Sequence, residues 1–162
     1  MDRRSLYDED VYAWAQQQAD ALRRLAGSRP DLPNELDLEN VAEEIEDVGK
    51  SELGKVESFI ELILVHLIKA ASVPSADPFR AWGKEVTVFR AQLLKNLTRS
   101  MRAKIDMDEL WRLARLRADA DLTKQGDHIL SQLAPSSPFA LEDLTGPEFS
   151  FEAAVARVAP AA

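Results

Sequence analysis

Cysteine is absent from this chain of 162 residues. Its absence excludes disulfides, thiol catalysis and thiolate zinc sites, and it suits a reducing cytosol. Glycine is also scarce, because only six glycines are scattered through the sequence. No phosphate-binding loop of the GxxxxGK or GxGxxG kind can be written from them. The usual nucleotide-dependent enzymes are therefore not expected, and no cofactor is predicted.

Long apolar runs are lacking as well. The most apolar stretch, Phe59 to Val73, is interrupted by Glu61, His66 and Lys69. It falls short of the roughly 20 residues that a membrane span requires. At the N-terminus two arginines are followed by acidic side chains rather than by an apolar core, so no secretory signal can be read. These observations predict a cytoplasmic protein with no membrane partner.

The composition is that of one globular domain with a single core. Hydrophobic residues make up 46% of the chain and charged residues 30%, which is ordinary for such a domain. We therefore predict a single helical domain over residues 1–162, with frayed tails at 1–5 and 153–162. The net charge of -8 argues against general attraction to nucleic acids, because a binding face would have to overcome a repulsive field.

The spacing of apolar residues predicts four main helices and no strands. Prolines, glycines and capping residues set their expected limits. Short helical turns are expected further on, in the segments HILSQL and FALEDL. The fold class is therefore all-α, a helical bundle of about four main helices with a long central helix and short C-terminal helical turns. The four helices are expected between Asp8 and Gly27, between Asp37 and Pro74, from Pro78 onward, and between Asp106 and Gly126.

The second of these helices carries apolar residues on more than one side, which predicts neighbours on more than one side. Gly49 and Gly54 each weaken the helix and leave open a bend between its acidic and apolar halves. One stripe recurs at spacings of three and four and includes two titratable residues. Its members are Val41, Ile45, Val48, Glu52, Val56, Phe59, Ile63, His66 and Ala70, and a second stripe contains Ile60, Leu64, Leu67 and Ala71.

Five segments of the sequence together form a recognisable pattern. They are LYDEDVYAWAQQQADALR at Leu6–Arg23, LDLENVAEEIEDVGKSE at Leu36–Glu52, LILVHLIKA at Leu62–Ala70, the segment around Trp82, and SPFALEDL at Ser137–Leu144. With them the chain resembles a bacterial family called domain-of-unknown-function family 29. The resemblance covers most of the chain and implies a helical bundle without a known activity. The family usually has a Ser-Pro-Ser-Leu turn after the third helix, whereas Asn96–Met101 read NLTRSM here. That departure leaves open a longer third helix.

Glu44, Glu52 and His66 are the candidate site residues. Carboxylates and an imidazole on one helix suggest oxygen and nitrogen ligands for a metal. Glu44 and His66 are, however, 22 residues apart, which is about 33 Å along a continuous helix. The structural interpretation makes the carboxylates a solvated face and His66 a buried, hydrogen-bonded ring. We favour the structural interpretation and name no catalytic residue.

Charge is unevenly distributed between neighbouring helices. Asp31 to Glu61 contains eleven acidic residues and two lysines, whereas Arg80 to Lys104 contains seven basic residues and Glu85. Such complementarity can align helices within a chain or across a dimer interface. The basic helix could also face RNA or DNA, but no aromatic interleaving or binding motif accompanies it.

Two classes of function remain, with a third held as a remote alternative. The first is a bacterial interaction module that binds itself, as a homodimer, or another protein. The alternative is a metal-binding or enzymatic domain that uses Glu44, Glu52 and His66. The remote alternative is nucleic-acid binding through the basic third helix.

Overall fold

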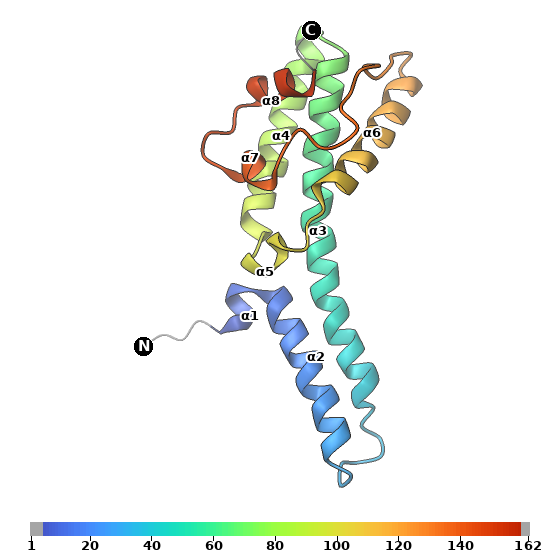
Figure 1. The fold of residues 1–162 in the computed structure, drawn as a ribbon, viewed down its shortest axis with the longest axis vertical. Helices are drawn as coiled ribbons and strands as arrows, with labels where there is room; N and C mark the ends of the chain where they lie inside the picture. The colour runs from blue at the N-terminus through green and yellow to red at the C-terminus, as the bar shows by residue number, and fades with distance from the viewer. Residues whose placement is uncertain (1–4, 160–162) are drawn as a thin grey trace. The chain divides into compact units, whose positions relative to one another are not determined.

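The computed structural model describes residues 5–159, and within them it contains helices and no strands. Figure 1 shows the order of the helices along the chain. The prediction of an all-α fold with a long central helix is confirmed. The helices are α1 (Leu6–Glu9), α2 (Val11–Ser28), α3 (Leu38–Ser72), α4 (Ala76–Asn96), α5 (Arg99–Arg102), α6 (Met107–Lys124), α7 (Leu141–Thr145) and α8 (Phe151–Val158).

The described residues form two compact units. One contains residues 5–55 and 97–104, and the other contains residues 56–96 and 105–159. The 35-residue helix α3 contributes its first half to the former and its second half to the latter. The helix runs through Gly49 and Gly54 without a break in its secondary structure. The two units are called here the N-terminal unit and the C-terminal unit.

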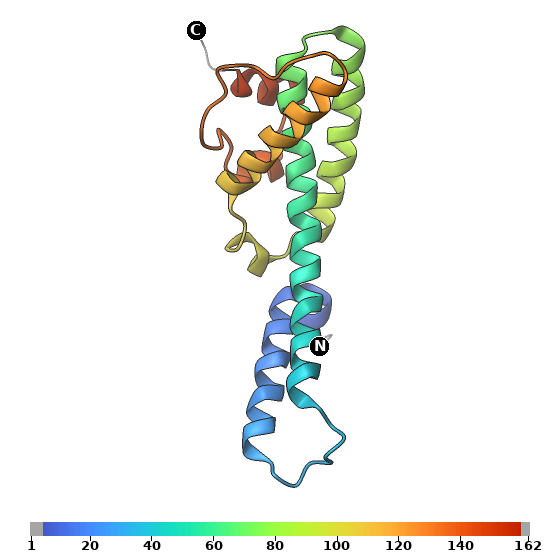
Figure 2. The same ribbon diagram turned by 90° about the vertical axis from the view of Figure 1, so that its right-hand side faces the viewer.

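Small side chains hold the N-terminal unit together. Helix α2 runs antiparallel to the first half of α3, as both views show (Figures 1 and 2). Ala15 and Ala19 of α2 are fully buried, and so is Ala42 of α3. A Cβ atom added at Gly49 would lie 2.9 Å from the Cβ of Ala15. Gly49 therefore allows a closer approach of the two backbones than any other residue would.

Two details of this unit differ from the sequence prediction. Asp10, not Asp8, caps α2, because its side chain accepts a hydrogen bond from the Ala13 amide. Val41 and Val48, members of the predicted apolar stripe, are 41% and 48% exposed. The small residues of α2 pack against the neighbouring face of α3 instead, which leaves the two valines uncovered.

The second half of α3 is the core of the C-terminal unit. Ion pairs link it to α6, from Arg117 to Glu61 at 3.3 Å and from Lys69 to Asp121 at 2.7 Å. Helix α4 lies beside it on another side (Figures 1 and 2). Coverage from two sides explains why this half is apolar all round. Its fully buried residues include Ile60, Ile63, Leu64, Leu67 and Ile68.

The connections of this unit follow the predicted limits in part. Asp106 caps α6 by accepting from the amides of Asp108 and Glu109, and Gly126 after it has a φ of 80°. The segment FALEDL contains most of α7, whereas HILSQL at 128–133 has no helix. Helix α4 ends at Asn96, so the third helix is not extended. Residues 153–158, expected in a frayed tail, lie within α8, and the tail residues 1–4 and 160–162 lie outside the described residues.

Alanine at Gly49 and alanine at Gly54 are expected to change stability in opposite directions. Nothing lies within 4 Å of a Cβ added at Gly54, so Gly54→Ala gains only helix propensity and stabilises by about 0.5–1 kcal/mol. Gly49→Ala forces α2 away from α3 and costs about 1–2 kcal/mol net. Urea unfolding followed by circular dichroism measures both. Equal effects from the two variants would contradict the close packing at Gly49.

Candidate functional sites

His66 is a buried side chain whose two ring nitrogens both have hydrogen-bond partners. It is 8% exposed. Its Nδ1 lies 2.7 Å from the Leu62 carbonyl oxygen, and its Nε2 lies 2.5 Å from Oε2 of Glu85. Because a carbonyl oxygen can only accept, Nδ1 carries a proton. The ring also packs on Phe89, with centroids 5.4 Å apart. Neither nitrogen therefore has a free lone pair directed at open space.

The structure does not collect the predicted site residues into one cluster. Glu44 is exposed and belongs to the N-terminal unit. Glu52 belongs to the same unit and lies 3.9 Å from Lys55, whereas His66 belongs to the C-terminal unit. Within residues 5–159, no group of three or more His, Asp or Glu side chains could hold a metal ion. The metal-binding or enzymatic function of these residues therefore stays a prediction, which no cluster of side chains among the described residues supports.

Asp10 is the most heavily hydrogen-bonded carboxylate of the N-terminal unit, and the sequence analysis did not single it out. It is 8% exposed. It accepts from the Ala13 amide at 3.1 Å and from the Thr98 hydroxyl at 2.8 Å. The amide and the hydroxyl of Ser100 donate to it at 2.8 and 2.6 Å. This carboxylate thus ties α2 to the turn before α5.

The pKa of Asp10 is lowered. Burial acts to raise it, but the hydrogen bonds from Ser100, Ala13 and Thr98 favour the charged form and together outweigh burial. The segment NLTRSM, which departs from the family pattern, supplies three of these four donors. Its signal in the sequence is a hydroxyl residue just before a short helix and a second one inside it. The partner of both residues, Asp10, is distant in the sequence, so the signal cannot be interpreted locally. We assign this network a structural role.

A line of exposed residues on α3 combines apolar and acidic side chains. Asp37 precedes the helix and accepts from the Asn40 amide at 3.2 Å, which confirms the predicted cap. Val41, Glu44 and Val48 follow at spacings of four, three and four and are exposed. These four residues share one face of the helix, and we call them the acidic seam.

A line of exposed residues on α4 has the same spacing and the opposite charge. Lys84, Val88, Ala91 and Lys95 also follow one another at four, three and four, and all are exposed. Val88 is 59% exposed. We call these four residues the basic seam. In the part of the chain that the structure describes, Glu44, Lys84 and Lys95 form no ion pair within the copy.

The helices define an all-helical protein. No helix among the described residues has the length and apolar character needed to cross a membrane. The model of a family described as "Domain of unknown function DUF29" matches residues 6–150. The chain therefore belongs to this family.

One solved structure is similar to this chain over nearly its whole length. It is the crystal structure of an alpha-helical protein of unknown function from Rhodospirillum rubrum. The two chains are 39% identical, with a TM-score of 0.87. The match covers 98% of this chain and 100% of that one. A search of curated proteins gave no match. The resemblance predicted from the motifs is thus confirmed, for the family and for the fold.

Proposed function

We propose that this protein is a cytoplasmic interaction module that associates with a second copy of itself, the acidic seam of one copy packing against the basic seam of another. The observation that carries the proposal is the pair of exposed seams with the same 4-3-4 spacing and opposite charge. Helices pair along such lines, because residues three and four apart lie on one face.

The side chains of the two seams are complementary when the helices run parallel. Asp37 then lies opposite Lys84, and Val41 lies opposite Val88. Glu44 lies opposite Ala91, one turn from Lys95. Val48 lies opposite Lys95, whose aliphatic stem can cover it. Apolar contact supplies the attraction, and the charges set register and orientation. A contact of this size is small, so we expect a transient association with a Kd on the order of tens of micromolar.

Like charges argue against pairing of two acidic seams. Glu44 of one copy would approach Glu44 of the other, and the flanking face also carries Glu43 and Asp47. Juxtaposed like charges oppose association. The pairing of an acidic seam with a basic seam is therefore favoured over the pairing of like seams. Homodimerisation is the form of self-association that we propose.

Val41→Lys is expected to weaken self-association at least tenfold. The substitution places a positive charge opposite Val88 and one turn from Lys84 of the basic seam, while the exposed position leaves the helix folded. Sedimentation velocity over a concentration series measures the effect. Leu116→Lys on α6 is the matched control, since Leu116 is 60% exposed and lies on neither seam. A wild-type chain that stays monomeric over the whole series, or equal weakening by both variants, would overturn the proposal.

A further inference from the structure

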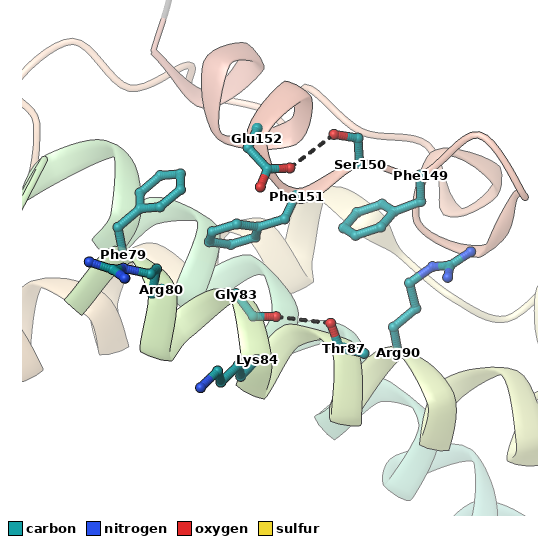
Figure 3. A pocket seen from close by; sticks show the side chains of 10 residues that line it. All are labelled: Phe79, Arg80, Gly83, Lys84, Thr87, Arg90, Phe149, Ser150, Phe151 and Glu152. Atoms are coloured by element: carbon teal, nitrogen blue, oxygen red, sulfur yellow. Dashed lines mark hydrogen bonds between the residues drawn. The ribbon is translucent and has the colours of Figure 1, made fainter. Parts of the chain in front are cut away.

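A groove of about 590 Å³ lies between one face of α4 and the segment that leads into α8. Figure 3 shows the rings of Phe79, Phe151 and Phe149 in a row above α4. The centroids of Phe79 and Phe151 are 5.0 Å apart. At the far end of the row, the guanidinium of Arg90 lies 4.9 Å from the centre of the Phe149 ring. The groove therefore has an aromatic wall that is half-buried and already ordered.

Gly83 shapes the groove. A Cβ atom added there would lie 3.0 Å from Cδ1 of Phe151, so the absence of a side chain allows the ring to lie on the helix. Glycine inside a helix costs about 1 kcal/mol relative to alanine. Thr87, the next residue along the groove floor, donates its hydroxyl to the Gly83 carbonyl oxygen at 3.0 Å, within its own helix. Gly83 and Thr87 therefore leave the volume of the groove open.

The two sides of the groove differ in charge. Arg80, Lys84 and Arg90 line it from α4, and Ser150 and Glu152 line it from the other side. Arg90 is engaged, because it donates to the carbonyl oxygens of Leu144 and Gly146. Lys84 is exposed, and the exposed Arg80 has a long ion pair with Asp77, at 3.5 Å, so both keep most of their charge available to a ligand. Positive charge thus borders the aromatic row along the α4 side.

We propose that this groove binds an acidic peptide segment of a partner protein that carries an aromatic or large apolar side chain. The apolar side chain packs on the row of phenylalanine rings, and the carboxylates of the peptide face Arg80 and Lys84. Aromatic residues and arginine together are typical of the residues that dominate protein interfaces. The charge complementarity is local, so a short acidic segment fits where a long polyanion would meet the net charge of -8.

Glu152 restricts further the kind of ligand that the groove can bind. Its carboxylate lies 3.2 Å from the Ser150 hydroxyl on the side opposite the basic residues. It repels a second anionic group on that side and so favours a ligand with charge along one edge only. Inorganic phosphate has no apolar surface to place on the aromatic row. The site is distinct from the two-seam contact, although Lys84 borders both.

Selection from a random dodecapeptide library tests the proposal. The intact protein is immobilised, and the enriched peptides are then titrated in solution by fluorescence polarisation. We expect enrichment of peptides that contain Asp or Glu within a few residues of Phe, Trp or Leu. Arg80→Glu is expected to weaken their binding at least tenfold, because it reverses the charge beside the aromatic row. Arg24→Glu is the matched control, since Arg24 is an exposed arginine of α2, and it should leave binding unchanged.

Three outcomes would overturn the proposal. The library gives no enrichment, or the enriched peptides bind Arg80→Glu as well as the wild type. In the third outcome, inorganic phosphate or an oligodeoxythymidylate displaces the peptides at the peptides' own concentration, which identifies a general anion site. Phe79→Ala provides a second variant that removes ring surface without changing charge, and it should also weaken binding. Failure of self-association leaves these results unchanged, because the assay uses the protein at concentrations below the expected Kd of the seams.

Discussion

Asp10→Ala is expected to destabilise the N-terminal unit by about 3–5 kcal/mol. The substitution leaves the Ala13 amide, the Thr98 hydroxyl and both donors of Ser100 without their acceptor. Loss of a helix cap alone costs about 1 kcal/mol, and each buried donor left unpaired adds to that cost. Since whole domains are stable by only about 5–15 kcal/mol, most of the unit should unfold well before the wild type in urea.

Two variants serve as controls for Asp10. Asp8→Ala removes an exposed carboxylate that accepts from the Ser5 hydroxyl, and it should cost no more than about 0.5 kcal/mol. Asp10→Asn keeps one accepting oxygen and should lose about half as much stability as Asp10→Ala. Circular dichroism during urea unfolding measures all three. Equal midpoints for Asp8→Ala and Asp10→Ala would contradict the role assigned to this carboxylate.

Acid should remove part of the same stabilisation. The pKa of Asp10 in the folded chain is lowered from an ordinary value of about 3.9. A carboxyl with a lowered folded pKa contributes stability that is present above the unfolded pKa and is lost as the pH falls through the folded one. The wild-type unit should therefore lose more stability below about pH 4 than Asp10→Asn does. Parallel urea titrations at pH 6 and pH 3 would show the difference.

Arg90→Ala is expected to detach the C-terminal segment from α4, at a cost of about 2–3 kcal/mol. The guanidinium donates to the Leu144 carbonyl oxygen at 2.8 Å and to the Gly146 carbonyl oxygen at 2.6 Å. It also lies over the ring of Phe149. A charged donor at the carbonyl end of α7 satisfies groups that the helix itself leaves unpaired.

Arg90→Lys should recover less than half of this loss, because an ammonium cannot reproduce the planar fork of donors. Arg80→Ala is the matched control, since Arg80 is an exposed residue of the same helix whose ion pair with Asp77 is long, at 3.5 Å. Hydrogen exchange of residues 141–151 and thermal unfolding measure the three variants. Protection of this segment that is unchanged in Arg90→Ala would show that the guanidinium does not hold it.

The ends of α3 and α6 could be predicted from the sequence, because they depend on residues close to each end. Asp37 and Asp106 cap α3 and α6 through the amides three residues on or nearer, and Gly126 supplies the positive φ after α6. The residue that caps α2 could not be chosen from neighbouring residues, because Asp8 and Asp10 are both plausible caps. The choice of Asp10 depends on Thr98 and Ser100, almost ninety residues away.

Which face of α3 is buried could not be derived from the spacing of apolar residues in α3 alone. Its first half offers more than one apolar face, and the pattern placed Val41 and Val48 inside. The face that is covered is set by Ala15 and Ala19 of α2, which are both fully buried. The same limitation applies to the groove. Nothing near Phe79 in the sequence indicates that the rings of Phe149 and Phe151 lie across from it.

The central claim is that the acidic seam of one copy binds the basic seam of another. The most direct test mixes two charge-reversal variants, Glu44→Lys and Lys95→Glu, in sedimentation velocity. Each variant alone keeps one charged seam and carries opposite charges that cancel in the other, so each should associate about tenfold more weakly than the wild type. In an equimolar mixture, the native basic seam of the first variant can meet the native acidic seam of the second, and association should return. A mixture that associates no better than either variant alone would contradict the claim.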